Sequence, residues 1–179
     1  MRPSDESQLI ERAKQHDPEA ISELYNRHVD QIYQYVRSRT GETAVAEDIT
    51  ADVFLRALES LATYDDHGVP FAAWLYRIAQ ARVIDYWRRT QRRATVPFDD
   101  LDLPEWSAGD DVANADILQQ GLLQAGLQQI TEDQRQVIVL KFVRGLSNAE
   151  IAQIMGKTEG AIKALQRRGL EALARLLKE

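Results

Sequence analysis

The chain contains no cysteine, and this absence removes several kinds of chemistry. Disulfide bonds, thiolate metal ligands and thiol redox sensing are all excluded for its 179 residues. Long apolar runs that could span a bilayer are also missing, as is the charged, apolar and small pattern of an export signal. We therefore expect a cytoplasmic protein that does not insert into a membrane.

Strand signals are scarce, whereas helical periodicity recurs along most of the chain. The sequence predicts an all-α protein of two small helical domains joined by an acidic, flexible linker. We expect the first domain at residues 1–94, the linker at 95–115, and a C-terminal domain with a helix-turn-helix at 116–179. The length suffices for each domain to bury a core of its own.

Positive charge is concentrated at two places despite a formal net charge of -6. Residues 1–93 carry 13 Lys/Arg against 15 Asp/Glu, residues 94–134 carry none against 9, and residues 135–179 carry 9 against 4. A further basic island lies near the end of the first segment. The negative net charge taken alone would argue against nucleic-acid binding. Two basic surfaces on either side of an acidic tether are nevertheless compatible with it.

Four helices are expected in the first domain. A short helix at about 9–14 precedes a long one that opens at Asp17-Pro18 and ends near Thr40-Gly41. Two more are expected at about 42–61 and 71–93. In the second domain, a helix at 116–130 is followed by a capping box, Thr131-x-x-Gln134, that opens a helix to Val143.

Residues 147–168 have the pattern of a helix-turn-helix. Ser147 and Glu150 form a capping box, Gly156-Lys157 breaks the first helix, and Thr158 caps the second. The second helix places its apolar residues on one face, which consists of Ile162, Leu165, Gly169, Leu173 and Leu176. The opposite face is small and cationic, with Gly160, Lys163, Ala164 and Arg167, and with Arg168 on its flank.

A small, cationic helix face suits the floor of a DNA major groove, where Lys and Arg reach guanine edges and phosphates. The alternative interpretation is a solvated charged helix on an ordinary bundle. The two caps, the glycine turn and the cationic face together favour DNA binding.

The helix expected at 42–61 has an unusual exposed side. Asp48, Asp52, Leu55 and Glu59 form an acidic stripe around an apolar residue, with Arg56 beside them. This surface suits a protein partner with basic, apolar helices, and the alternative is an ordinary wet face. The other side is expected to be core and contains Ala46, Ile49, Val53, Phe54, Ala57 and Leu61.

The helix expected at 71–93 has two apolar stripes. Phe71, Trp74, Leu75 and Ile78 form a core stripe. About 120° away, Tyr76, Val83 and Trp87, with Tyr86 beside them, are interleaved with arginines. Aromatic rings beside arginines suit single-stranded DNA, because rings stack on exposed bases while arginines neutralise phosphates. The alternative is that the second stripe packs on the helix at 17–40. The arginines expected to meet phosphates are Arg88, Arg89, Arg92 and Arg93.

Three segments resemble the extracytoplasmic-function (ECF) sigma factors of the sigma-70 family, over nearly the whole chain. AEDITADVFLRAL (46–58) is similar to the family's core-polymerase-binding motif. FAAWLYRIAQARVIDYWRR (71–89) is similar to its promoter-melting and minus-ten-reading helix, and LSNAEIAQIMGKTEGAIKALQRR (146–168) to its minus-thirty-five-reading helix-turn-helix. The resemblance implies a sigma factor that binds core RNA polymerase and directs promoter-specific initiation.

The resemblance also implies three sets of site residues. The core-polymerase-binding residues, facing the clamp helices of the largest subunit, would be Asp48, Asp52, Val53, Phe54, Leu55, Arg56 and Glu59. The residues that bind melted minus-ten DNA would be Tyr64, Phe71, Trp74, Tyr76, Arg77, Gln80, Ala81, Trp87, Arg88 and Arg89. The residues that bind minus-thirty-five duplex DNA would be Ser147, Lys157, Thr158, Glu159, Gly160, Lys163, Ala164, Arg167 and Arg168.

No catalytic residue, cofactor or metal is expected. The implied partners are core RNA polymerase, promoter DNA as duplex and as melted single strand, and an anti-sigma factor that masks polymerase-binding surfaces. One rival interpretation is a helix-turn-helix regulator that acts without polymerase. A second is an enzyme acting on nucleic acid, with Asp65-Asp66-His67 as a metal site.

A separate hypothesis concerns what the acidic linker contacts in the free protein. Its carboxylates could lie across the arginine-rich helix when polymerase is absent and act as a weak mimic of DNA, with a plain solvated tether as the alternative. The acids concerned are Asp99, Asp100, Asp102, Asp110 and Asp111.

Overall fold

A computed structural model of the chain describes residues 5–65, 69–93 and 129–176, and within these ranges every regular element is a helix. The all-α prediction is therefore confirmed. The N-terminal unit consists of α1 (Asp5–Lys14), α2 (Pro18–Thr40), α3 (Thr43–Ser60), the 3-10 turn η1 (Leu61–Thr63) and α4 (Phe71–Arg93). The C-terminal unit consists of α6 (Glu132–Ile138), the π-helical turn η2 (Val139–Val143), α7 (Asn148–Met155) and α8 (Glu159–Leu176). The expected linker at 95–115 and nearly all of the expected helix at 116–130 lie outside the described residues.

Local capping chemistry decides where the long helix α2 begins and ends. The Asp17 carboxylate accepts hydrogen bonds from the backbone N–H of Glu19 at 3.0 Å and of Ala20 at 3.4 Å, ahead of Pro18 in the first turn. At the other end, Gly41 adopts a φ of 80° and its N–H donates to the Arg37 carbonyl at 3.0 Å. Glycine reaches this left-handed conformation without a Cβ clash, so the predicted boundary is confirmed.

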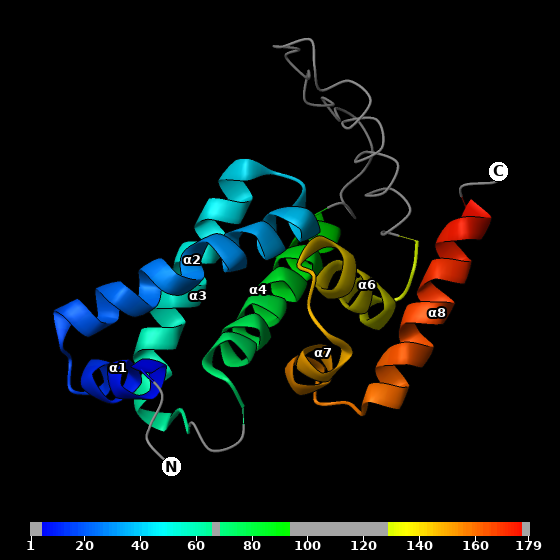
Figure 1. Cartoon of the computed structure of the whole chain (residues 1–179). Helices are drawn as coiled ribbons and strands as arrows, with labels where there is room; N and C mark the ends of the chain where they lie inside the picture. Colours follow the sequence, from blue (N-terminus) through cyan, green and yellow to red (C-terminus); the bar gives the residue numbers. More distant parts are fainter. Residues whose placement is uncertain (1–4, 66–68, 94–128, 177–179) are drawn as a thin grey trace, which may run out of the picture.

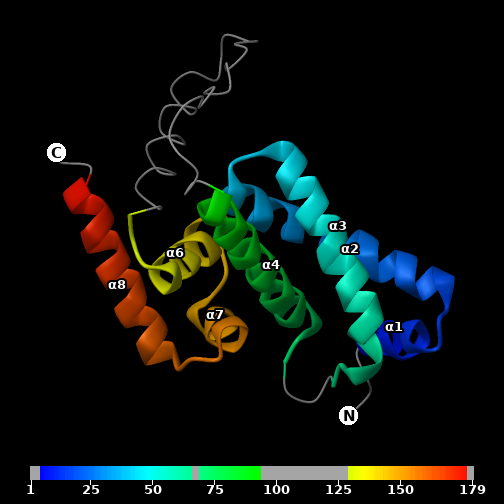
Figure 2. The same ribbon diagram turned by 180° about the vertical axis from the view of Figure 1, so that it is seen from behind.

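The core of the N-terminal unit forms where α2, α3 and α4 meet. All six residues predicted for the inner face of α3 are buried: Ala46, Ile49, Val53, Phe54, Ala57 and Leu61. Tyr35 of α2 and Leu75 of α4 are fully buried beside them. The two views in Figures 1 and 2 place α4 at the centre of the molecule, between α2 and α3 on one side and α6 and α7 on the other.

In the C-terminal unit, α6 packs along α8, and the predicted faces of α8 are confirmed in the described part of the helix. Ile162 and Leu173 are buried and Leu165 is half-buried, whereas Lys163 and Arg167 are exposed. The α6 segment is not one regular helix to Val143 as expected. It widens into a π-helical turn at Val139, which the Arg144 N–H closes by donating to the Val139 carbonyl at 3.1 Å.

None of the described helices combines the length and the apolar composition needed to cross a membrane.

Gly169 provides a stability test of the contact between α6 and α8. A Cβ added at Gly169 would lie 2.7 Å from Ile138 Cδ1 and 3.3 Å from Gln134 Cβ, so we expect Gly169→Leu to destabilise the C-terminal unit by about 1–3 kcal/mol through overpacking. Gly160→Leu is the matched control, because its nearest neighbour is Thr158 Oγ1 at 4.0 Å. Denaturant unfolding followed by circular dichroism measures both, and equal stability of the two variants would contradict the packing assignment.

Candidate polymerase and DNA interfaces

The helix-turn-helix is positioned by reciprocal caps. The Ser147 hydroxyl accepts from the Glu150 N–H at 3.2 Å, and the Glu150 carboxylate accepts from the Ser147 N–H at 2.7 Å. The Ser147 hydroxyl also donates to the Glu150 carboxylate at 2.7 Å, and this hydrogen bond, together with the one from the Ser147 N–H, holds the pKa of Glu150 below its ordinary value because both favour the ionised carboxylate. Gly156 turns the chain with a φ of 62°, and the Thr158 hydroxyl caps α8 by accepting from the Ala161 N–H at 3.2 Å. All three predicted signals are confirmed.

The outer face of α8 is exposed and cationic. Lys163, Arg167 and Arg168 are exposed, and Gly160 and Ala164 on the same face are small enough for the helix to approach a surface closely. Arg167 lies 3.9 Å from the Glu171 carboxylate with 74% of its side chain exposed, so this ion pair is weak. Of the other residues predicted for the upstream duplex, Ser147, Thr158 and Glu159 are exposed, and Lys157 forms an ion pair with Asp133 at 3.1 Å.

The acidic stripe lies on the outer face of α3. Asp48 and Glu59 are exposed, and Leu55 between them is 57% exposed. Asp52 is partly neutralised, since Arg56 lies 3.0 Å away and Arg82 of α4 lies 3.9 Å away. The unbalanced negative charge of this face is therefore carried by Asp48 and Glu59.

Two residues of the predicted polymerase set lie beneath the stripe. Val53 is fully buried and Phe54 is 8% exposed, so both hold α3 in place from the core side and neither is available to a partner in this conformation.

An apolar cavity of about 320 Å³ adjoins the stripe between α2 and α3. Tyr25 and Leu58 at its rim are 45% and 46% exposed, and the Tyr25 ring packs on Phe54 with 4.8 Å between centroids. Neither Tyr25 nor Leu58 is among the site residues predicted from the sequence. Leu58 could have been found from the sequence, because it lies three residues after Leu55 and helical periodicity puts both on adjoining parts of one helix face.

The residues predicted to bind melted DNA on α4 and just before it are only partly buried. Tyr64, Phe71 and Tyr76 are buried, and the Tyr64 and Phe71 rings meet edge to face at 5.4 Å. The alternative that the second stripe of α4 packs on α2 is confirmed for Tyr76, whose ring meets Tyr35 at 5.3 Å, and Val83 is fully buried. Trp74 and Trp87 are half-buried, whereas Ala81, Arg88 and Arg89 are exposed.

The C-terminal unit contacts part of this surface of α4. Arg77 donates to the Ile154 carbonyl at 3.0 Å and to the Gln153 carbonyl at 2.5 Å, and Arg144 donates to the Tyr76 hydroxyl at 3.3 Å. Gln80 donates to the Gln136 side chain. Three of the residues expected to meet melted DNA, Tyr76, Arg77 and Gln80, therefore contact the chain's own C-terminal unit.

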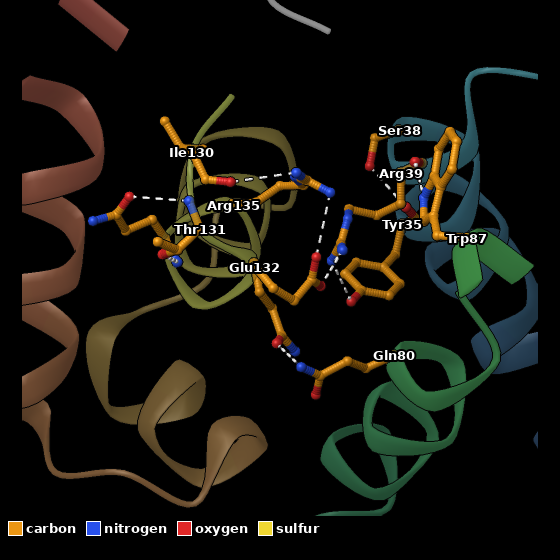
Figure 3. A network of polar contacts seen from close by, with 11 residues as sticks. Tyr35, Ser38, Arg39, Gln80, Trp87, Ile130, Thr131, Glu132 and Arg135 are labelled. Carbon is orange, nitrogen blue, oxygen red and sulfur yellow. Dashed lines mark hydrogen bonds and ion pairs between the residues drawn. The ribbon is translucent and has the colours of Figure 1, made fainter. Parts of the chain in front are cut away.

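A buried ion pair joins the two units beside these contacts (Figure 3). The Arg39 side chain is fully buried and forms an ion pair with Glu132, which also lies 3.3 Å from Arg135. Arg39 further donates to the Tyr35 hydroxyl at 3.1 Å, and its backbone carbonyl accepts from the Trp87 indole N–H at 3.3 Å. Burial raises the pKa of Tyr35 to about 12, so its hydroxyl stays protonated.

Sequence reasoning missed these residues of the interface. Arg39 and Glu132 are 93 positions apart, and each is typical of its local setting, a cation in a last helical turn and an acid in a first one. Nothing in the sequence pairs them.

No group of three or more His, Asp or Glu side chains in the described ranges could hold a metal ion. Two of the three residues of the rival metal site, at positions 66 and 67, lie outside those ranges.

An all-α protein with a capped helix-turn-helix and an exposed cationic second helix belongs to the class of helix-turn-helix DNA-binding proteins. Sigma-70 region 2 matches residues 24–93, and Sigma-70 region 4 matches residues 120–173. The chain is 37% identical over 173 residues to the ECF RNA polymerase sigma factor BldN of Streptomyces coelicolor, covering 96% of this chain and 66% of BldN. It is 33% identical to the ECF RNA polymerase sigma factor SigL of Mycobacterium tuberculosis, covering 87% of this chain and 88% of SigL. The chain belongs to the ECF sigma factors of the sigma-70 family.

A solved structure extends the likeness to both units. CnrH in complex with the cytosolic domain of CnrY superposes with a TM-score of 0.73 at 25% identity, over 98% of each chain.

The Ser147 cap leads to a prediction on acid stability. The lowered pKa of Glu150 means that its ionised form stabilises the fold above the ordinary glutamate pKa, and that this contribution is lost as the pH falls through the lowered folded value. We expect Ser147→Ala to cost about 0.5–2 kcal/mol at pH 7 and to make unfolding less dependent on pH below about 4.5. Thermal unfolding between pH 3 and 7 measures this, and an unchanged pH profile would contradict it.

Proposed function

We propose that this sigma factor, which binds core RNA polymerase and directs promoter-specific initiation, docks on polymerase through the outer face of α3 and holds promoter DNA with α8 and α4. The observation that carries the proposal is the exposed stripe of Asp48, Leu55 and Glu59 in the region 2 match, together with the exposed cationic face of α8 in the region 4 match.

Charge and shape support α3 as the polymerase-docking face. Asp48 and Glu59 attract a basic partner, and Leu55 offers an apolar contact at the centre of the stripe. The adjoining cavity between Tyr25 and Leu58 has room for one large apolar side chain. A polymerase helix with basic residues on one side and a bulky apolar residue beside them would satisfy both features.

The α8 face supports upstream duplex binding. Lys163 and Arg167 lie one turn apart on the exposed side of α8. The first turn of this helix is capped by Thr158 and contains the small residue Gly160. This arrangement lets α8 enter a major groove, with its cations contacting bases and phosphates.

The cationic end of α4 supports capture of the melted strand. Arg88 and Arg89 are exposed at positions from which they can neutralise phosphates, and Trp74 and Trp87 offer partly exposed rings for stacking. Unstacking a base costs a few kcal/mol, which ring stacking and phosphate contacts would offset.

On this proposal the protein performs no covalent chemistry, needs no cofactor, and acts in the cytoplasm where polymerase works. An anti-sigma factor would regulate it by covering the α3 face. The direct test is in vitro transcription with core polymerase and fragmented genomic DNA, which reports both activity and promoter sequence. Absence of any specific transcript from a holoenzyme that forms normally would overturn the promoter-reading part.

Charge reversal on the stripe tests the polymerase-docking face. We expect Asp48→Lys with Glu59→Lys to weaken binding to core polymerase by at least about tenfold, because a basic partner is then repelled. Glu11→Lys with Glu19→Lys is the control, since it makes the same charge change on exposed residues of α1 and α2. Fluorescence anisotropy of labelled protein titrated with core polymerase measures both, and equal affinities would remove α3 from the interface.

Truncation on α8 tests upstream duplex binding. If the Arg167 guanidinium contacts a base, Arg167→Ala should weaken binding of the holoenzyme to the upstream element by about 1–3 kcal/mol. If it contacts a phosphate, the slope of log affinity against log salt concentration should become shallower by about one. Filter binding over a range of salt concentrations separates these cases, and Arg175→Ala is the control at the far end of α8. Wild-type affinity and salt dependence in Arg167→Ala would contradict the assignment.

A further inference from the structure

We propose that His28, a buried residue of α2, positions the aromatic rings that capture melted promoter DNA at the start of α4, and that Glu6 of α1 holds His28 in place. This proposal rests on the assignment of Trp74 and its neighbours to the melted minus-ten strand. It gives a role in promoter capture to α1, which precedes the segment that matches Sigma-70 region 2 from residue 24 onward.

Both ring nitrogens of His28 have a side-chain partner. Nε2 lies 2.8 Å from the Glu6 carboxylate, and Nδ1 contacts the Gln31 side-chain amide one turn later in α2. With the Gln31 amide donating to Nδ1 and the Nε2–H donating to Glu6, a neutral imidazole satisfies all three side chains. Because His28 is buried, water has little access to the ring, and removal of the Glu6 carboxylate would leave a ring nitrogen without a partner.

The His28 ring links this hydrogen-bonded group to the aromatic side chains at the start of α4. The His28 and Phe71 rings meet edge to face, with 5.3 Å between their centroids. Phe71 in turn lies 5.4 Å from Tyr64 and 5.6 Å from Trp74, and the Tyr64 and Trp74 centroids are 4.9 Å apart. Tyr64, Phe71 and Trp74 are named here the base-capture cluster. A movement of the His28 ring would therefore reach the whole cluster through Phe71.

Trp74 is the member of the base-capture cluster that can contact DNA in this conformation. It is half-buried, whereas Tyr64 and Phe71 are buried. The two buried rings therefore set the orientation of the indole, and the indole offers its exposed part to a base. Because stacking depends on the distance and angle between two ring faces, a small rotation of Trp74 would weaken base capture.

Packing alone leaves room for Phe71 to move. Its ring borders the apolar cavity of about 320 Å³ between α2 and α3. A side chain beside empty space lacks van der Waals contacts on that side, so its position depends more strongly on the rings on its other sides. A His28 ring fixed by two hydrogen-bonded partners resists displacement of Phe71, whereas a His28 ring that has lost Glu6 is free to shift with it.

Two polar contacts at adjacent positions join α1 to α2, and only one of them involves the base-capture cluster. The helix α1 packs on α2 and also touches η1 (Figures 1 and 2). Asp5 forms an ion pair with Arg27 at 2.7 Å, next to the contact of Glu6 with His28. Arg27 has its second partner in Glu23 of its own helix, at 2.8 Å. Asp5→Ala is therefore a matched control for Glu6→Ala.

Fluorine NMR of the full chain labelled with 5-fluorotryptophan tests the positioning role directly. The Trp74 resonance is assigned by its loss in Trp74→Phe. We expect Glu6→Ala to shift or broaden this resonance and Asp5→Ala to leave it unchanged. Glu6→Gln keeps an oxygen acceptor for the His28 Nε2–H and should give the parent spectrum.

Circular dichroism verifies that each variant is folded, and Glu6→Ser takes the place of Glu6→Ala should that variant unfold. An unchanged Trp74 resonance in the folded Glu6 variant, or an equal change in Asp5→Ala, would overturn the positioning role.

The second readout is capture of melted DNA by the holoenzyme. The probe is a fluorescent single-stranded oligonucleotide with the minus-ten sequence of a promoter found by in vitro transcription. Glu6→Ala should weaken its binding by about fivefold or more through the unpaired ring nitrogen, and Glu6→Gln should restore parent affinity. Affinity for duplex DNA of the upstream element should stay at the parent value. Equal oligonucleotide affinities of Glu6→Ala and Asp5→Ala would contradict the proposal.

Failure of the proposed function gives a different result. If the rings of α4 do not hold melted DNA, Trp74→Ala binds the oligonucleotide as tightly as the parent, while the fluorine shift in Glu6→Ala persists. If only the positioning role is wrong, Trp74→Ala weakens binding and Glu6→Ala behaves like Asp5→Ala in both measurements.

Discussion

A single buried guanidinium determines how the two halves of this molecule meet. Arg39 lies at the end of α2 with its side chain fully buried, and a buried cation is tolerated only with an anionic partner and hydrogen-bond acceptors around it. Glu132 supplies the charge, and the Tyr35 hydroxyl accepts a further hydrogen bond at 3.1 Å. Together with the hydrogen bonds of Tyr76, Arg77 and Gln80, this ion pair joins the C-terminal unit to α2 and α4.

The two proposed DNA-binding surfaces differ in their contacts with the rest of the chain. On the proposed duplex-binding face of α8, Lys163 and Arg168 are exposed. On the proposed single-strand surface of α4, Arg77 and Gln80 form hydrogen bonds with residues of α7 and α6.

The proposed polymerase-docking face is separate from both. Its apolar and acidic groups lie on α3 and the adjoining part of α2, where Leu55, Leu58 and Tyr25 are each close to half exposed. Exposed apolar side chains beside unbalanced charge are costly for a free protein and suit a face that is covered in an assembly.

The sequence alone determined the structural features that depend on interactions between neighbouring residues. Helix ends at Asp17, Gly41, Ser147 and Gly156 could be predicted because caps and positive-φ turns act within a few residues. The buried face of α3 and the two faces of α8 could be predicted because helical periodicity fixes which residues share a side. The family could be predicted because its motifs are contiguous.

Tertiary structure decided the contacts between residues that lie far apart in the chain. Whether Tyr76 and Trp87 face DNA or α2 could not be read from periodicity, since an aromatic stripe suits either surface until its neighbour is known. The partners of Arg39, Arg77 and Gln80 come from 56 to 93 positions away, and only the packing of α6 and α7 on α4 brings them together. Local chemistry fixed the helices, and the burial of charge between them fixed their arrangement.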